Sequence, residues 1–156
     1  MMPDTTRQLR ALAALSLLLP LAACSGPGPD GNGELDGCLL GDRGTIAIGV
    51  TNSSGEPIAI SDVDLGESTA VTVIDRFLAV DDDARDTAVI FSDRGREAFG
   101  GVNIDRAPLE PGASAFVGIE VARSGSGESR VGSLVVTTDG AQHGVPVTLA
   151  LGGPCD

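Results

Sequence analysis

The sequence has no tryptophan, tyrosine or lysine, and it contains only four phenylalanines. Its ten basic residues, all arginines, are outnumbered by 22 aspartates and glutamates, which gives a formal net charge of -12. Binding to nucleic acid depends on a basic surface that neutralises phosphates and on aromatic side chains on which bases stack. The chain offers neither feature, so we exclude nucleic acid as a partner.

Histidine is almost absent, which removes the side chain used most often as a general base and metal ligand. The one histidine, His143, lies in a predicted turn and is expected to be solvated. It could pair with Asp139 and Ser133, but the chain has no Gly-x-Ser-x-Gly sequence to present a nucleophilic serine. After residue 23 the chain also lacks methionine, a soft ligand for copper. We therefore predict no catalytic residues, no metal site and no cofactor.

Long apolar runs are missing too. The run from Ala11 to Leu21 has eleven residues and contains Pro20. At 1.5 Å per residue, such a helix would cover only about half of a ~30 Å hydrocarbon core. Arg7 and Arg10 precede the run and small residues follow it, an order typical of a secretory signal peptide. A transmembrane helix is therefore the weaker interpretation.

The sequence Leu21-Ala22-Ala23-Cys24 follows directly and resembles the lipobox of bacterial lipoproteins. The resemblance implies that the thiol of Cys24 receives a diacylglycerol and that cleavage removes residues 1–23 as the signal peptide. The protein would then be anchored by lipid to a bacterial cell membrane, on its extracytoplasmic side. The alternative, an ordinary secretory signal, would leave Cys24 as an unpaired third cysteine.

The rest of the chain is rich in glycine and in short alternating segments. It has 22 glycines, about twice the usual share of roughly 7 %. Residues 24–37 are mostly glycine, proline and polar residues, which predicts a disordered tether. Beyond them, apolar and polar residues alternate in segments that turn-forming clusters separate, as in half-buried strands. We therefore predict an all-β antiparallel sandwich of about seven or eight strands over residues 38–156.

The expected strands are residues 44–50, 58–65, 70–74, 87–91, 99–104, 113–121, 131–138 and 145–151. The first two are expected to form a hairpin, with a bulge near Ser61 and Asp62 where the alternation changes phase. The last three predict a three-stranded antiparallel meander. Pro146, which has no N–H to donate, favours either an edge position for the final strand or a proline nitrogen that faces solvent. A short helix is expected around Asp82 to Arg85.

Four motifs in the turns and strands recur in a known family. They are Thr51-Asn52-x-Ser54-Gly55-x-Pro57-Ile58, Leu109-Glu110-Pro111-Gly112-x-Ser114, Gly132-x-Leu134-Val135-Val136-Thr137-Thr138-Asp139 and Val145-Pro146-Val147-x-Leu149. Over residues 44–152 the chain thereby resembles the Ig-like domains of the abnormal-spindle and Hydin type, which also occur in bacterial envelope proteins. The resemblance implies an Ig-like sandwich with a binding or scaffolding role and no catalytic residues. Residues 74–107 match none of the motifs, so the strand order there stays open.

Cys38 and Cys155 stand just before the first expected strand and just after the last. Outside the cytoplasm two free thiols tend to oxidise, so we predict a disulfide bond between them. It would close a loop of about 117 residues, which the chain-entropy model values at about 4–5 kcal/mol. The alternatives are two independent thiols or an intermolecular bridge.

Two further patterns have plain interpretations. The acidic segment 81–86, with Asp81, Asp82, Asp83 and Asp86, could hold a hard cation or meet a basic partner, but a solvated loop is the simpler interpretation. The sequence Asn52-Ser53-Ser54 matches a glycan acceptor, but we interpret it as a turn.

These observations favour a lipid-anchored envelope protein whose Ig-like domain is a non-catalytic interaction or structural module. Its contacts, to a protein partner in the envelope, would come from sheet edges or loops. The rival hypothesis is an envelope lipoprotein that binds a small molecule or lipid between its two sheets. Four phenylalanines and many small side chains would barely fill a sandwich core about 10 Å thick, which counts against a large internal cavity.

Overall fold

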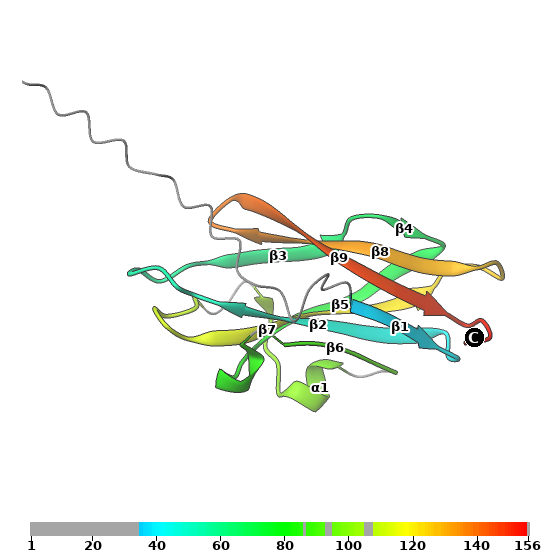
Figure 1. Ribbon diagram of the computed structural model, residues 1–156, viewed down its shortest axis with the longest axis horizontal. Coiled ribbons are helices and arrows are strands. Elements are labelled where there is room, and N and C mark those ends of the chain that lie inside the picture. Colours follow the sequence, from blue (N-terminus) through cyan, green and yellow to red (C-terminus); the bar gives the residue numbers. More distant parts are fainter. Residues whose placement is uncertain (1–34, 86, 93–94, 105–107, 156) are drawn as a thin grey trace, which may run out of the picture.

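The structure, a computed structural model, describes residues 35–85, 87–92, 95–104 and 108–155. The elements are β1 (Leu35–Leu39), β2 (Arg43–Thr51), β3 (Ile60–Leu65), β4 (Ser68–Thr69), β5 (Val71–Val80), η1 (Asp82–Ala84), β6 (Ala88–Phe91), α1 (Gly95–Phe99), β7 (Ser114–Arg123), β8 (Ser129–Thr138) and β9 (Ala141–Leu151). Sheet A has the order β1-β9-β8-β3, with β4 also beside β8, and sheet B has the order β5-β7-β2-β6. The two sheets face each other (Figure 1), which confirms the predicted β-sandwich.

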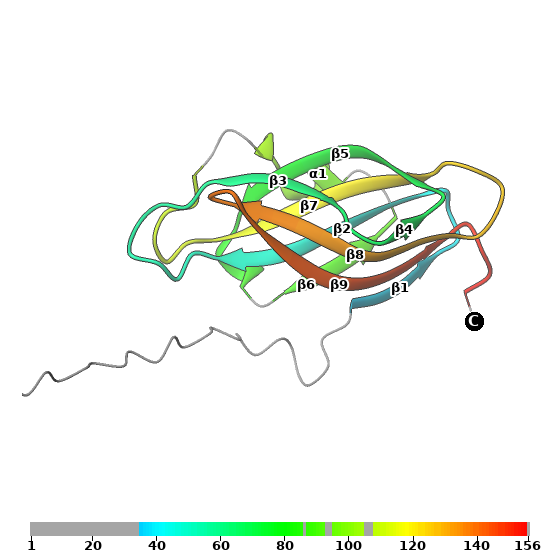
Figure 2. The ribbon, with the colours of Figure 1, turned by 90° about the horizontal axis from the view of Figure 1, so that it is seen from above.

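The predicted pairing of neighbouring strands is partly wrong. The strands at 44–50 and 58–65 form no hairpin, because β2 lies between β7 and β6 in sheet B while β3 lies beside β8 in sheet A. Of the predicted meander, β8 and β9 do form a hairpin, but β7 belongs to the other sheet (Figure 2). Alternation tells which face of a strand is buried, not which strand lies beside it, and connections in a sandwich often cross between sheets.

The middle of the chain differs most from expectation. Strand β5 is twice as long as the predicted strand at 70–74, and β6 lies within the predicted 87–91. The strand expected at 99–104 is wrong: Phe99 ends α1, and Val102 makes only an isolated bridge to Leu78 of β5. Gly100, at φ +64°, turns the chain after the helix. The short helix expected at 82–85 is confirmed as η1, and the Asp81 carboxylate accepts a hydrogen bond from the amide of Asp83.

The predicted bulge in β3 is confirmed by a shift of register between Ile60 and Asp62. Pro146 stands near another shift of register, opposite Ser133, and β1 pairs with β9 only from Val147 onward. The edge position expected for the final strand is wrong for β9 as a whole, which lies between β1 and β8, but Pro146 stands just before the part that pairs with β1. Strand β1, parallel to β9, is an addition to the predicted strands. It begins at Leu35, so residues 35–37, expected in the tether, belong to sheet A.

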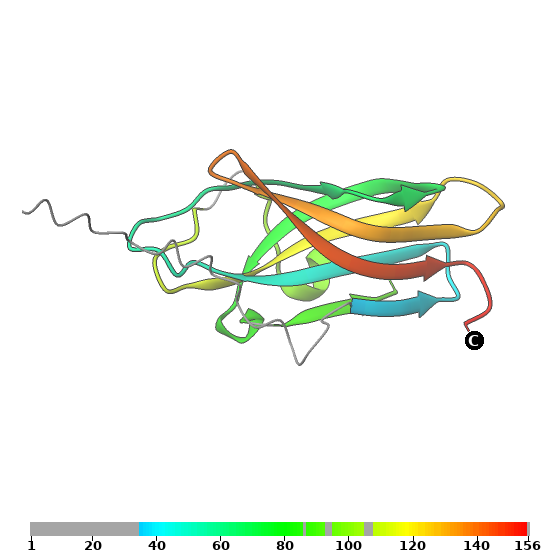
Figure 3. The ribbon, with the colours of Figure 1, turned by 45° about the horizontal axis from the view of Figure 1, so that its top comes forward.

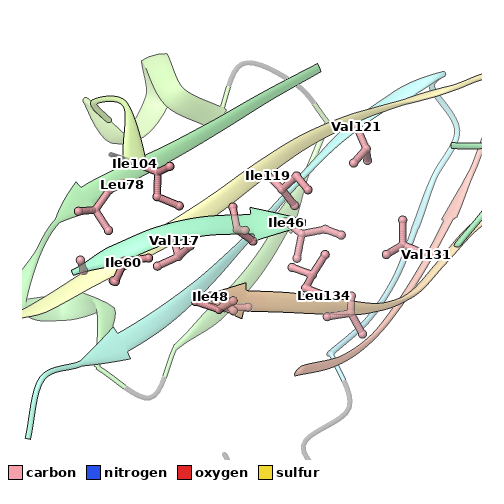
Figure 4. Packing of buried hydrophobic residues seen from close by; sticks show 14 of the residues in the cluster. Ile46, Ile48, Ile60, Leu78, Ile104, Val117, Ile119, Val121, Val131 and Leu134 are labelled. Atoms are coloured by element: carbon pink, nitrogen blue, oxygen red, sulfur yellow. The ribbon is translucent and has the colours of Figure 1, made fainter. Parts of the chain in front are cut away.

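The main core lies between the two sheets. Ile46 and Ile119 of sheet B face Leu134 of sheet A (Figure 4), and each of these three side chains is fully buried. Burying a side chain of this size contributes about 1.5–3 kcal/mol. The buried members of the cluster are Ile46, Ile48, Ile60, Val63, Leu78, Ile104, Leu109, Ala115, Val117, Ile119, Val121, Val131, Leu134, Val136, Val147, Leu149 and Leu151.

A second core covers the outer face of sheet B. We call residues 95–104 the strap: α1 packs on this face (Figure 1), Val102 pairs with Leu78 at the free edge of β5, and Ile104 ends in the main core. Phe99 of the strap contacts three other rings, with centroids 5.9 Å from Phe77, 5.3 Å from Phe91 and 4.7 Å from Phe116. All four phenylalanines of the chain therefore meet on one face. Strand β7 is buried on both sides from Ser114 to Val121 as a result.

Gly118 makes this second core possible. It lies on β7 opposite Phe77 of β5, and a Cβ at Gly118 would overlap the ring of Phe77. We predict that Gly118→Ala lowers the free energy of unfolding by about 2–3 kcal/mol, since the ring must leave its rotamer or the strap must shift. Denaturant unfolding checks this. Gly144→Ala, on β9 with open space around it, is the matched control and should change stability by less than about 1 kcal/mol. Equal effects of the two substitutions would contradict the prediction.

Candidate functional site

Of the residues predicted to have a role, Cys24 and the signal peptide lie outside the described residues, as does the tether up to residue 34. The lipid attachment therefore stays a prediction. The described residues contain no helix that is both long and apolar enough to cross a membrane.

The predicted disulfide bond is confirmed. Cys38 of β1 is bonded to Cys155, with their Cα atoms 5.6 Å apart. Gly152, at φ +68°, turns the chain directly after β9, and its amide donates to the carbonyl of Leu39 at 2.9 Å. The end of the chain is thereby brought back beside β1 (Figure 3). The bond links the first and last described segments of the domain across the edge of sheet A.

The outer face of sheet B carries a second site, which we call the strap pocket. It is an open pocket of about 500 Å³ between the strap and β7, lined by Arg96, Glu97, Gly100, Gly101 and Glu120. The strap backbone approaches the sheet closely at Gly101, where a Cβ would lie 2.6 Å from the ring of Phe77. The pocket therefore lies on the opposite face of sheet B from the main core.

Arg96 fixes the strap to the sheet through Asp75 of β5. Its Nε donates to one Asp75 oxygen at 2.6 Å and its Nη2 to the other at 2.5 Å. Nη2 also donates to the carbonyl of Arg76, and Nη1 donates to Oδ1 of Asn103. The hydrogen bond from Arg96 is the main reason that the pKa of Asp75 lies below its ordinary 3.8, while burial acts in the opposite direction. The same hydrogen bond raises the pKa of Arg96.

Glu120 stands next to this ion pair but takes no part in it. It is the direct neighbour of Asp75 on one side and of Thr45 on the other, in the register of β5, β7 and β2. Only 8 % of its surface is exposed, and within the described part of the chain its carboxylate has no hydrogen bond or ion pair. The hydroxyl of Thr45, fully buried, is likewise without a partner. A carboxylate so placed normally has a cationic or N–H partner.

The residues of the hypothetical triad are each engaged elsewhere. His143 is exposed, and its Nε2 is 2.9 Å from the hydroxyl of Thr138. The hydroxyl of Ser133 accepts from the amide of Glu67 at 2.8 Å, and the carboxylate of Asp139 accepts from the amide of Ala59 at 3.0 Å. His143 lies within β9, opposite Val136, and not in the predicted turn.

Asn52 and the acidic segment 81–86 also have structural roles. Asn52 is 1 % exposed, and its side-chain amide donates to the carbonyls of Glu56 and Leu109, both at 2.8 Å. This buried amide orders the turn and cannot accept a glycan. Asp81 caps η1, while Asp82 and Asp83 are exposed; Asp86 lies outside the described residues. Among the residues that are described, no group of three or more histidine, cysteine, aspartate or glutamate side chains could hold a metal ion.

Sequence reasoning identified the disulfide but missed the strap pocket. Glu120 occupies the polar phase of an alternating strand, a position that predicts a solvent-facing side chain. Its burial depends on the strap, whose residues 99–104 were expected to form a strand of their own. The one available signal is the Gly100-Gly101 pair: Gly100 turns the chain at a positive φ, and Gly101 lets the backbone approach Phe77 closely.

Comparison of the chain with protein-family models, with curated proteins and with solved structures finds no match.

We predict that removing the disulfide with Cys38→Ser and Cys155→Ser together lowers the free energy of unfolding by about 3–5 kcal/mol, because the bond closes a long loop. Denaturant unfolding of the oxidised protein and of the double variant checks this. Reductant should shift the unfolding midpoint of the parent protein and leave that of the double variant unchanged. A parent midpoint that does not respond to reductant would show that the bond contributes no stability.

Asp75→Asn should make the pH dependence of stability shallower in acid. Since the folded-state pKa of Asp75 is lowered, its ion pair stabilises the protein above the ordinary pKa of 3.8 and is lost as the pH falls through the folded-state value. At pH 7 the variant should be less stable by about 1 kcal/mol, and the difference should shrink toward zero below about pH 4. Unfolding curves between pH 7 and pH 3 measure this difference in stability. Asp36→Asn, at an exposed residue of β1, is the control. A difference that stays constant with pH would contradict the assigned ion pair.

Proposed function

We propose that this chain is a lipid-anchored protein of the bacterial cell envelope whose sandwich is a non-catalytic interaction or structural module. The observation that carries the proposal is the use of the three cysteines. Cys24 follows an apolar run in a lipobox-like sequence, and the other two are bonded to each other. Lipidation of Cys24 would leave no unpaired thiol, as expected in an oxidising compartment.

The position of β1 supports a tethered domain. The chain that comes from Cys24 enters the sandwich at Leu35, in an edge strand with only one hydrogen-bonded neighbour in its sheet. Terminal strands of this length fray unless they are tied down. The bond from Cys38 to Cys155 joins β1 to a segment 117 residues away in the sequence, close to the point where a membrane tether would pull.

The charge of the exported part supports a domain that stands away from the bilayer. Without residues 1–23 the chain has 8 arginines and 21 acidic residues, a net charge of -13. Anionic headgroups repel such a domain, so it would stand off the bilayer at the end of its tether. The domain would therefore meet partners in the aqueous part of the envelope, with a preference for cationic or neutral surfaces.

The packing favours an interaction role over a ligand held between the sheets. The side chains that meet there are fully buried on both sides, among them Ile46, Ile119 and Leu149. The strap pocket lies outside the sandwich, on the far face of sheet B. A binding site on an outer surface is expected in a domain that contacts a partner, and not in one that holds a ligand between its sheets.

Cys24→Ala tests the anchor. We expect the native protein to begin at Cys24 and to carry a diacylglyceryl group, since two acyl chains suffice for stable membrane attachment. The variant should keep residues 1–23 and lack the lipid. Intact-mass analysis measures both. The double variant Cys38→Ser, Cys155→Ser is the control and should stay lipidated. A native protein with an unmodified residue 24 would refute the proposal.

A further inference from the structure

A row of polar residues crosses the outer face of sheet B beneath the strap. Asp75 on β5, Glu120 on β7 and Thr45 on β2 are direct neighbours in register. On one side of this row the neighbours on the same face are apolar or glycine, among them Phe77 and Gly118. On the other side Arg43, exposed on β2, lies next to Thr45 without an ion pair to any described residue. Two acidic residues opposite each other on neighbouring strands repel, so this arrangement costs stability unless cations compensate both.

One of the two carboxylates is compensated within the chain. Asp75 receives two hydrogen bonds from Arg96. Four of the five N–H groups of a guanidinium are used here, on Asp75, on the carbonyl of Arg76 and on Asn103. Arg96 thus lines the strap pocket with its charge matched and its donors almost fully engaged.

The other carboxylate has no compensating cation among the described residues. Glu120 is 8 % exposed, lines the strap pocket, and has no hydrogen bond or ion pair with any residue that the structure describes. The neighbouring hydroxyl of Thr45 is fully buried and also unpartnered. Buried charges in proteins are paired, because removing them from water costs several kcal/mol each. An open pocket of about 500 Å³ above Glu120 is within the size range of ligand sites.

We propose that the strap pocket binds an alkylammonium or alkylguanidinium group, with Glu120 as its carboxylate. The cation would come from a lysine or arginine side chain of a partner protein or from a free amine. A metal ion fits less well, since hard cations need several oxygen ligands and both oxygens of Asp75 are occupied by Arg96. The inference rests on the proposed interaction role, to which it adds the chemistry that the partner presents.

The test uses the purified, oxidised protein and simple probes: n-butylammonium, n-butylguanidinium and, as the neutral control, n-butanol. Amide N–H correlation spectra at constant ionic strength report on Gly100, Gly101 and Glu120. We expect saturable shifts of these amides with either cation and none with n-butanol. Binding to Glu120→Gln should be at least about tenfold weaker, since a charge-assisted hydrogen bond is lost.

Two variants make the result specific. Glu110→Gln removes the same charge from an exposed position and should bind the cations like the parent protein. Glu120→Asp keeps the charge on a shorter side chain and should bind more weakly than the parent but more tightly than Glu120→Gln. Dispersed spectra of all three variants would show that each is folded. Equal binding by Glu120→Gln and the parent, or the absence of saturable shifts with both cations, would overturn the proposal.

A blocked peptide with one lysine, compared with its Nε-acetylated form, distinguishes the two sources of the cation. Tighter binding of the lysine peptide than of n-butylammonium assigns the site to a protein side chain, and weaker binding assigns it to a free amine. Either result supports the site only if the same probe binds Glu120→Gln at least about tenfold more weakly than it binds the parent protein. The mass of residue 24 is measured separately, so a lipidated protein that binds no cation would overturn this inference and leave the proposed anchor intact.

Discussion

Strand β7 is covered on both faces, and the other features of the domain follow from this. Its inner side chains, such as Ile119, enter the main core, and its outer face packs under the strap. The outer face of β7 packs so closely against Phe77 that a side chain at Gly118 would overlap its ring. The same packing covers Glu120, which would otherwise be exposed to solvent. The double burial of β7 therefore makes both the second core and the strap pocket.

The strap is held by a few strong contacts rather than by its own helix. A helix of five residues, Gly95–Phe99, is far too short to be stable alone. Phe99 supplies apolar contacts with three rings, and Arg96 supplies the bidentate bond to Asp75. The two anchors lie one turn apart, on the same side of the helix. Because the pocket wall is built on this short segment, its shape depends on an ion pair at one end and an aromatic contact at the other.

The sequence was sufficient to predict the sandwich and the disulfide but not the pairing of the strands. Alternation places Ile46, Ile48 and Val117 in the core without ambiguity. It does not specify a partner, which is why β2 and β3 were expected in one sheet. Strand β1 escaped notice because Asp36 and Gly37 interrupt any apolar pattern, and its stability comes from β9 and from the bond at Cys38. Glu120 could not be singled out, since its environment is created by residues distant in the sequence.

The edges of the two sheets are poor places for a partner to add a strand, which directs attention to the strap pocket. Edge strands invite pairing when they are long and regular. In the described residues, β3 has a bulge, and at the free edge of β5 Leu78 forms an isolated bridge with Val102. Strands β1 and β6 have five and four residues, and they lie against each other where Gly37 meets Ile90. On the opposite side Arg76 of β5 donates to the carbonyl of Val63 of β3 and closes the gap between the sheets. With both sides closed, a partner of the proposed kind would have to bind outside the hydrogen-bonding edges, and Glu120, without an ion pair among the described residues, lies on such a surface beneath the strap.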